Sequence, residues 1–151
     1  MLYLSLKLVH FVFMGTWFGS SLFSLRDIKS SFAAGPAHIP LLRARMQVVG
    51  RLAMLSGALT LLSGVGLIFA LGGFAAVPRA IHLGLLTGLV TAIVGGAGVG
   101  RTWQAIEQRL DAGADAAAVA PLVKRIGMLS GIFHLLWVVS LVLMVFRGAI
   151  G

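Results

Sequence analysis

Four long apolar runs, separated by polar segments, dominate the pattern of hydrophobic and polar positions along the chain. They cover residues 2–25, 52–74, 80–100 and 126–146. Each has about the 20 residues that an α-helix needs to cross roughly 30 Å of hydrocarbon. The pattern therefore predicts an all-α integral membrane protein, a four-transmembrane-helix bundle that forms one membrane domain over residues 1–151.

The first apolar run is predicted to be a retained helix rather than a cleaved signal peptide. It is too long for a signal peptide, it contains Lys7 and His10, and it has no clear small-residue cleavage site. Composition agrees with a membrane protein, because 59% of the residues are hydrophobic and only 11% are charged.

The polar connections contain the usual signals of turns. Residues 27–50 are expected to form a loop, with turns at Gly35, Pro36 and Pro40, before a basic stretch leads into the second helix. The third helix is expected to continue through Leu110 and to turn near Gly113, and the Ala-rich residues 116–123 allow an early start of the fourth helix.

Cationic residues cluster in two of the three connections, which predicts the topology. The first of these connections holds Arg26, Lys29, Arg43, Arg45 and Arg51, and the third holds Arg101, Arg109, Lys124 and Arg125, against Lys7, Arg79 and Arg147 on the other side. The positive-inside rule then places both termini and the short second connection outside. In the inner membrane of a bacterium, which is the expected location, both termini are periplasmic. Topology and anionic lipid account for the net charge of +8, so no nucleic-acid partner is expected.

The absence of cysteine and the positions of the carboxylates exclude several kinds of chemistry. The chain has no cysteine, which excludes disulfides, thiolate metal sites and iron–sulfur clusters. All four carboxylates lie outside the apolar runs, so a pump or cation channel built on membrane-embedded carboxylates is not expected. Any chemistry must therefore use histidine, cations or a cofactor.

Three histidines, His10, His82 and His134, fall in the apolar runs, where an ionisable residue is costly and usually functional. At about 1.5 Å per residue, His10 lies about 12 Å and His134 about 18 Å from the outer boundary. These similar depths predict that both bind one b-type haem as its axial pair, since helical bundles commonly hold haem between histidines. His82, near the outer edge, is expected to meet propionates, quinone or water, and is the alternative second ligand.

Lys7, Met14 and Trp17 share a face of the first helix with His10. Lys7 is either a partner for a haem propionate or a lysine that extends to the headgroups. Trp17 either packs in the bundle or lies against the cofactor. Trp103, beyond the third run, is expected to be an interfacial anchor.

Glycines recur at helical spacing in the last two runs. They are Gly84, Gly88, Gly95 and Gly98 in the third run, and Gly127 and Gly131 beside His134 in the fourth. Such faces suit close packing of helices, including those of a homodimer, or a flat macrocycle lying on a surface without side chains.

The first run resembles a known family. Lys7 and His10 form a K-x-x-H motif that is followed by Trp17, Gly19 and Arg26, and this series is similar to the first helix of HemJ-type protoporphyrinogen IX oxidases. The resemblance implies that His10 takes part in haem or porphyrin binding and that Arg26 is important for activity. In the third helix His82 matches the family's histidine, whereas Gly84 replaces its lysine.

Three classes of function remain open. The first is a membrane haem protein that transfers electrons or oxidises a porphyrin-like or quinol substrate, with His10 and Arg26 as candidate catalytic residues. The H-x6-W-x-G string also resembles CopD-type copper-resistance membrane domains, which implies copper transport through His10, Met14 and other soft ligands. The third class is an accessory or assembly subunit without a cofactor. Whether the chain is an enzyme stays open.

Overall fold

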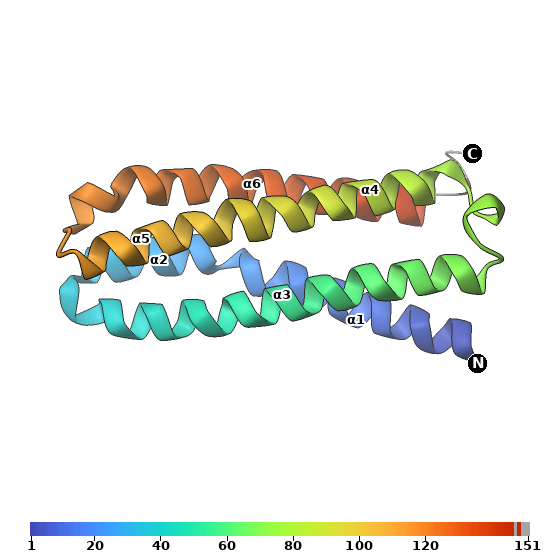
Figure 1. The fold of residues 1–151 in the computed structure, drawn as a ribbon, viewed down its shortest axis with the longest axis horizontal. Coiled ribbons are helices and arrows are strands. Elements are labelled where there is room, and N and C mark those ends of the chain that lie inside the picture. The colour runs from blue at the N-terminus through green and yellow to red at the C-terminus, as the bar shows by residue number, and fades with distance from the viewer. Residues whose placement is uncertain (147, 149–151) are drawn as a thin grey trace.

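The computed structural model describes residues 1–146 and 148, and in this part of the chain it contains helices and turns but no strand. Its helices join into four long rods, Leu2–Ala34, Pro36–Ala70, Arg79–Asp111 and Ala116–Val145. The rods run antiparallel to their neighbours in sequence, and the start of the first rod and the end of the fourth lie at the same end of the bundle (Figure 1). We call this end the terminal end and the opposite end the connection end.

Each rod is built from one to three helical elements. The first contains α1 (Leu2–Leu22) and α2 (Ser24–Ala34), and the second contains the 3-10 turn η1 (Pro36–His38) and α3 (Ile39–Ala70). After the 3-10 turn η2 (Phe74–Ala76), the third rod contains α4 (Arg79–Ile93), the π-helix η3 (Val94–Gly100) and α5 (Arg101–Asp111), and the fourth is α6 (Ala116–Val145).

All four rods are long and apolar enough to cross a membrane, which agrees with the prediction of four such helices. The expected loop over residues 27–50 is wrong, because α2 and the first turns of α3 are helical and only Gly35 makes the sharp turn, with φ of +99°. Pro40 lies in the first turn of α3, where the missing N–H of proline has no intrahelical partner to lose.

The third connection has the predicted form. Helix α5 ends at Asp111, the chain turns at Gly113 with φ of +83°, and α6 begins early, at Ala116. The Asp115 side chain caps α6 by accepting a hydrogen bond from the Ala118 N–H at 2.9 Å.

A break at Phe23 separates α1 from α2. The hydroxyl groups of Ser20, Ser21 and Ser24 donate to backbone carbonyl groups three or four residues earlier. Such bonds compete with the helical hydrogen bonds and favour a bend. Beyond the break, α2 contacts α6 as well as α3.

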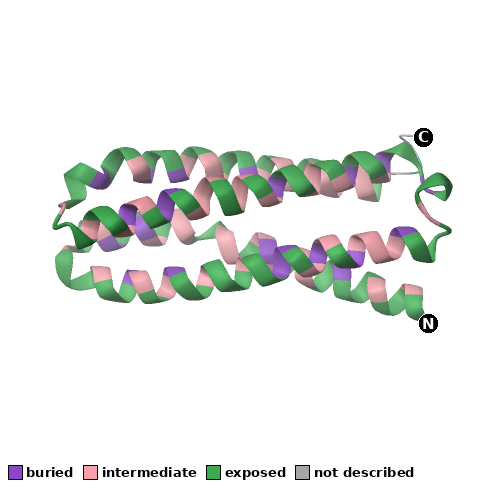
Figure 2. Cartoon of the chain, in the orientation of Figure 1, coloured by how far each residue is buried: buried purple, intermediate pink, exposed green. Residues whose placement is uncertain are grey.

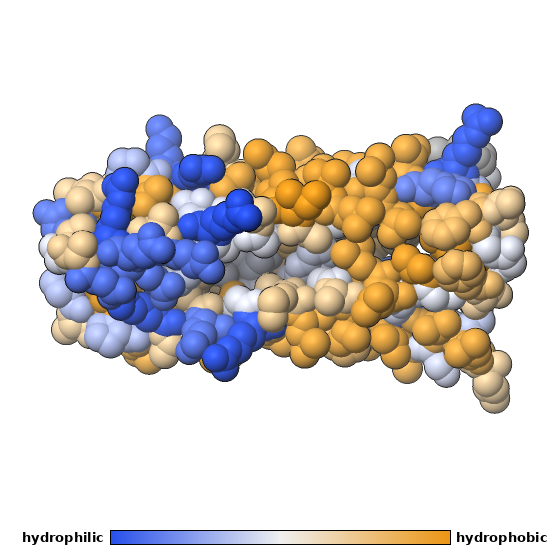
Figure 3. All heavy atoms as spheres, in the orientation of Figure 1, coloured by the Kyte–Doolittle hydropathy of each residue, from blue (hydrophilic) through white to orange (hydrophobic). Residues whose placement is uncertain are grey.

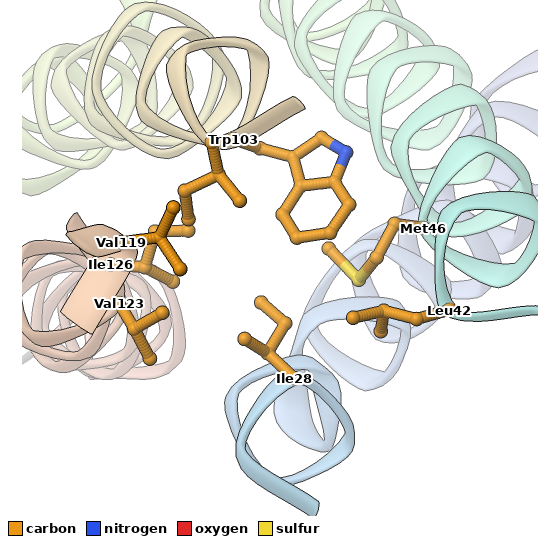
Figure 4. Packing of buried hydrophobic residues seen from close by; sticks show 8 residues of the cluster. Ile28, Leu42, Met46, Trp103, Val119, Val123 and Ile126 are labelled. Carbon is orange, nitrogen blue, oxygen red and sulfur yellow. The ribbon is translucent and has the colours of Figure 1, made fainter. Parts of the chain in front are cut away.

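The connection end is closely packed around a hydrophobic core. Its buried residues come from α2, α3, α5 and α6 and point toward one another (Figure 4): Ile28, Leu42, Met46, Trp103, Ile106, Val119, Val123 and Ile126. Trp103 has 8% of its surface exposed, so the expectation of an interfacial anchor is wrong. Helix α5 extends the third rod and turns this indole into the core rather than toward an interface.

Two ion pairs also hold the connection end together. Arg45 on α3 donates to both carboxylate oxygens of Asp27 on α2, at 2.9 and 2.8 Å, and Arg43 pairs with Asp111 of α5 at 2.6 Å. Both connections predicted to be cationic lie at this end, and in Figure 3 hydrophilic residues gather there while apolar side chains cover much of the remaining face. Arg147, expected at the other end, lies outside the described residues.

The terminal half of the bundle is packed differently. Here α1 packs mainly on α3, and α4 packs mainly on α6, with few contacts between the two pairs. The buried residues of this half gather along the inner side of the helix pairs, while the outer surfaces are largely exposed (Figure 2). The interface between the α1–α3 pair and the α4–α6 pair is therefore where a space can form within the bundle.

Candidate functional site

Two adjoining hollows lie between the α1–α3 pair and the α4–α6 pair. Their volumes are about 50 and 250 Å³. They are contiguous because both are lined by His10, Met14, Gly64, Ile68, Ile81 and Met144. We call the combined space the bundle cavity.

His10 is buried in the wall of this cavity, with 7% of its surface exposed. Its Nδ1 lies 3.0 Å from the Thr60 carbonyl oxygen and 3.1 Å from Ser63 Oγ. A carbonyl oxygen only accepts hydrogen bonds, so Nδ1 of the neutral ring carries the proton and Nε2 keeps its lone pair. In the described part of the chain, Nε2 has no hydrogen-bond partner. His10 therefore has an unshared nitrogen lone pair at the cavity.

Ser63 supports this arrangement. Its hydroxyl group can donate to the Leu59 carbonyl oxygen at 2.6 Å, which leaves Oγ free to accept from Nδ1 of His10. The imidazole is thus fixed in one orientation by two acceptors on α3, the neighbouring helix in space.

A strip of small residues on α3 makes room for the two ring side chains of α1. A Cβ atom on Gly57 would lie 2.9 Å from Cε2 of Trp17, and one on Gly64 would lie 3.2 Å from Cε1 of His10. Gly57, Thr60 and Gly64 are spaced by three and four residues and form one face of α3, beside Ser63. This spacing is visible in the sequence, but the predictions made from the sequence did not include it.

The opposite wall of the cavity comes from α4 and α6. Gly84 and Gly88 line it from α4, and Trp137, Ser140 and Met144 line it from α6. A Cβ atom on Gly84 would lie 3.2 Å from Cε of Met144, and Ser140 Oγ donates to the Gly84 carbonyl oxygen at 3.0 Å. Trp137 Nε1 is buried without a hydrogen-bond partner among the described residues.

Lys7 lines the larger hollow together with Tyr3, close to the start of α1. Its Nζ lies 6.0 Å from the centre of the Tyr3 ring and 5.9 Å from that of Phe11. Among the described residues that line the cavity, Lys7 is the one lysine or arginine. The position of Lys7 is compatible with pairing to an anionic group at the cavity.

His134 does not lie close to His10. Its Nε2 is 3.2 Å from Ser21 Oγ, and its ring packs against Phe18 and Phe133. Ser21 follows His10 by eleven residues on α1, which is about 16 Å along the helix. The predicted axial pair of His10 and His134 is therefore not assembled, because α1 and α6 are staggered and Met144 is the α6 residue level with His10.

His82 also points away from the cavity. It is exposed, its Nδ1 lies 3.2 Å from the Pro78 carbonyl oxygen, and its ring lies 6.0 Å from that of Phe74. Its neighbours on α4, Ile81 and Gly84, line the cavity, so His82 is on a different face of that helix.

Three other predicted residues lie far from His10. Arg26 is exposed on α2, and sixteen residues of helix, about 24 Å, separate it from His10. Gly127 packs against Leu25, with a Cβ position 3.2 Å from Cδ2, and Gly131 has open space around it. These residues do not share a site with His10, whereas Lys7 and Trp17 do.

The glycines of the third rod have two different roles. Gly95 and Gly98 accommodate Phe133 and Leu129 of α6, at Cβ distances of 3.2 and 3.4 Å. Only Gly84 and Gly88 line the bundle cavity. The expected flat face therefore serves helix packing along half of its length and borders the cavity along the rest.

Within residues 1–146 and 148, no group of three or more histidine, cysteine or carboxylate side chains is placed to hold a metal ion. Comparison with family models, with curated proteins and with solved structures found no match for the chain. A proposal about function therefore depends on the cavity and its residues.

Proposed function

We propose that the chain is a multi-pass protein of a bacterial inner membrane, with both termini periplasmic, that binds b-type haem in the bundle cavity through His10. Four rods of sufficient length and hydropathy support insertion into a membrane. The lysines and arginines of the two cationic connections support a cytoplasmic location for the connection end.

The state of His10 is the observation that carries the haem proposal. Histidines that ligate metals commonly donate the hydrogen of one ring nitrogen to a carbonyl group, which orients the ring and makes the other nitrogen a better ligand. The bond from Nδ1 to the Thr60 carbonyl oxygen has this form. It leaves Nε2 available at a cavity lined mainly by apolar residues.

The cavity walls suit a flat apolar macrocycle. Most of the lining residues are apolar, and Lys7 offers a cation for a carboxylate group of the macrocycle. The larger hollow, about 250 Å³, is somewhat smaller than typical ligand sites of about 300–1,000 Å³. Because few contacts join the two helix pairs, we expect them to move apart slightly when the ligand binds.

Met144 is the residue that would hold the haem iron together with His10. It comes from α6, the helix facing α1, whereas Met14 lies on the same helix as His10, one turn further on. Thioether and imidazole together are an established haem ligand set. Haem bound in this way would supply one-electron transfer. Because Arg26 is remote from His10, the arrangement favours electron transfer over porphyrinogen oxidation.

Copper binding is the second candidate, and one observation favours it. The imidazole of His10 and the thioethers of Met14 and Met144 all line the same cavity. Imidazole and thioether are ligands that suit Cu(I). A copper-handling protein would use these three side chains without a macrocycle.

Optical spectra and metal content separate the two candidates. The chain is produced in a haem-replete host, purified in mild detergent, and recorded in the oxidised and dithionite-reduced states. A Soret band that shifts on reduction, with haem near one equivalent per chain, supports the proposal. A colourless protein that remains colourless after haem is added refutes it, and one equivalent of copper in that protein supports the alternative.

A further inference from the structure

A groove between α2 and α6 at the connection end combines a cationic rim with an apolar floor. Its volume is about 370 Å³, and it is lined by Lys29, Phe32, Ala116, Ala120, Val123, Lys124 and Gly127. A second hollow, lined by Leu25, Arg26, Lys29 and Ser30, adjoins it at Lys29. We call the two together the α2–α6 groove.

The cationic side chains of this groove form no ion pair with a carboxylate among the described residues. Among the described residues, the ion pairs are Arg43 with Asp111, between α3 and α5, and Arg45 with Asp27, between α3 and α2. Arg26, Lys29 and Lys124 have no carboxylate partner in that part of the chain. The α2–α6 groove therefore has three positive charges and no acidic lining residue.

The order of residues along the two helices matches the order of groups in a phospholipid. Leu25 ends the first apolar run, and Lys29 follows one turn later toward the connection end. On α6, Lys124 comes first and Gly127 follows within the apolar run. Both lysines thus lie on the polar side of the boundary, with small or apolar residues on the other side.

We propose that the α2–α6 groove binds one anionic phospholipid, with its phosphate between Lys29 and Lys124 and its acyl chains extending past Leu25 along the apolar surface of the bundle. Basic pockets between membrane helices on the cytoplasmic side bind anionic headgroups. Ala116 and Ala120, which precede Lys124 toward the connection end, leave room for the headgroup on that side of the lysines. This inference rests on the proposed membrane location but not on haem binding.

Native mass spectrometry of the delipidated chain in detergent tests the site. The probes are phosphatidylglycerol and phosphatidylcholine with identical acyl chains. We expect phosphatidylglycerol to bind more tightly, and the double variant K29A/K124A to bind it about 30-fold more weakly, since each cation near a membrane surface contributes about 1 kcal/mol. The variant K29R/K124R, which keeps both charges, should retain binding.

The control variant is R51A/R125A, which also removes two exposed cations at the connection end, neither of which lines the groove. Equal losses in the control and in K29A/K124A would overturn the site, as would equal binding of the two lipids. Soluble glycerol phosphate that competes as well as the lipid would show an anion site instead and overturn the lipid assignment. Flotation with liposomes separately tests membrane insertion, so its failure is distinguishable from failure of the groove.

Discussion

The closeness of α1 and α3 depends on Gly57, and replacing it with alanine should destabilise the bundle. The new Cβ atom would lie 2.9 Å from Cε2 and 3.2 Å from Cζ2 of Trp17. Trp17 is buried, with 6% of its surface exposed, and its ring also packs against Phe133 at 5.6 Å between centroids. The rigid indole therefore has little room to move, and the helices must shift.

Gly50 provides a matched control on the same helix. It is exposed, and a Cβ atom there would meet nothing within 4 Å. Gly50→Ala and Gly57→Ala gain the same helix propensity, about 1 kcal/mol. Overpacking costs about 1–3 kcal/mol, so Gly57→Ala should be less stable than Gly50→Ala by that amount.

Thermal unfolding in detergent, followed by circular dichroism, measures this difference. A cost of about 1–3 kcal/mol corresponds to a Tm that is lower by several degrees in a chain of this size. The double variant G57A/W17F should recover most of the loss, because the smaller ring relieves the clash. Equal Tm values for Gly50→Ala and Gly57→Ala would refute the proposed packing of α1 on α3.

Three further predictions concern α6, the cavity and the topology. Asp115→Ala should lower stability by about 1 kcal/mol through loss of the helix cap, while Asp115→Asn should not, as thermal unfolding will show. In the haem-loaded chain, Met144→Leu should abolish the near-infrared band of a thioether bound to ferric iron, and Met14→Leu should preserve it. If both variants keep this band, Met144 is not a ligand of the iron. Since the chain has no cysteine, A75C should react with a membrane-impermeant maleimide in intact cells and A37C should not. If A37C is labelled and A75C is not, the topology is the reverse of the proposed one.

The sequence pattern was sufficient for features that depend on local composition. Apolar runs of about 20 residues identified the four long helices, and the turn at Gly113 with the early start of α6 at Ala116 followed from turn signals and alanine content. Helix α2 was missed because its exposed polar residues and the nearby Gly35 and Pro36 look like a loop. In the structure its one buried side, which includes Ile28, packs into the core of the connection end.

The candidate site was only partly predictable, because its geometry depends on contacts between distant segments. His10, Lys7 and Trp17 were recognised from one helix and do line the cavity. Thr60, which hydrogen-bonds to His10, and Met144, which lines the same cavity, come from helices whose stagger relative to α1 no hydropathy pattern determines. Counting residues from the ends of the apolar runs gave His134 and His10 similar depths. In the structure they lie at different levels, because α1 and α6 do not begin and end at the same level.

Retention of haem by His10→Ala and His134→Ala variants tests the central claim most directly. Each variant is purified from the haem-replete host, its fold is checked by circular dichroism, and its haem content per chain is measured from the reduced spectrum. We expect His10→Ala to lose haem and His134→Ala to keep it, because of these two histidines only His10 lines the bundle cavity. Loss of haem in His134→Ala with retention in His10→Ala would show that His10 does not hold the haem.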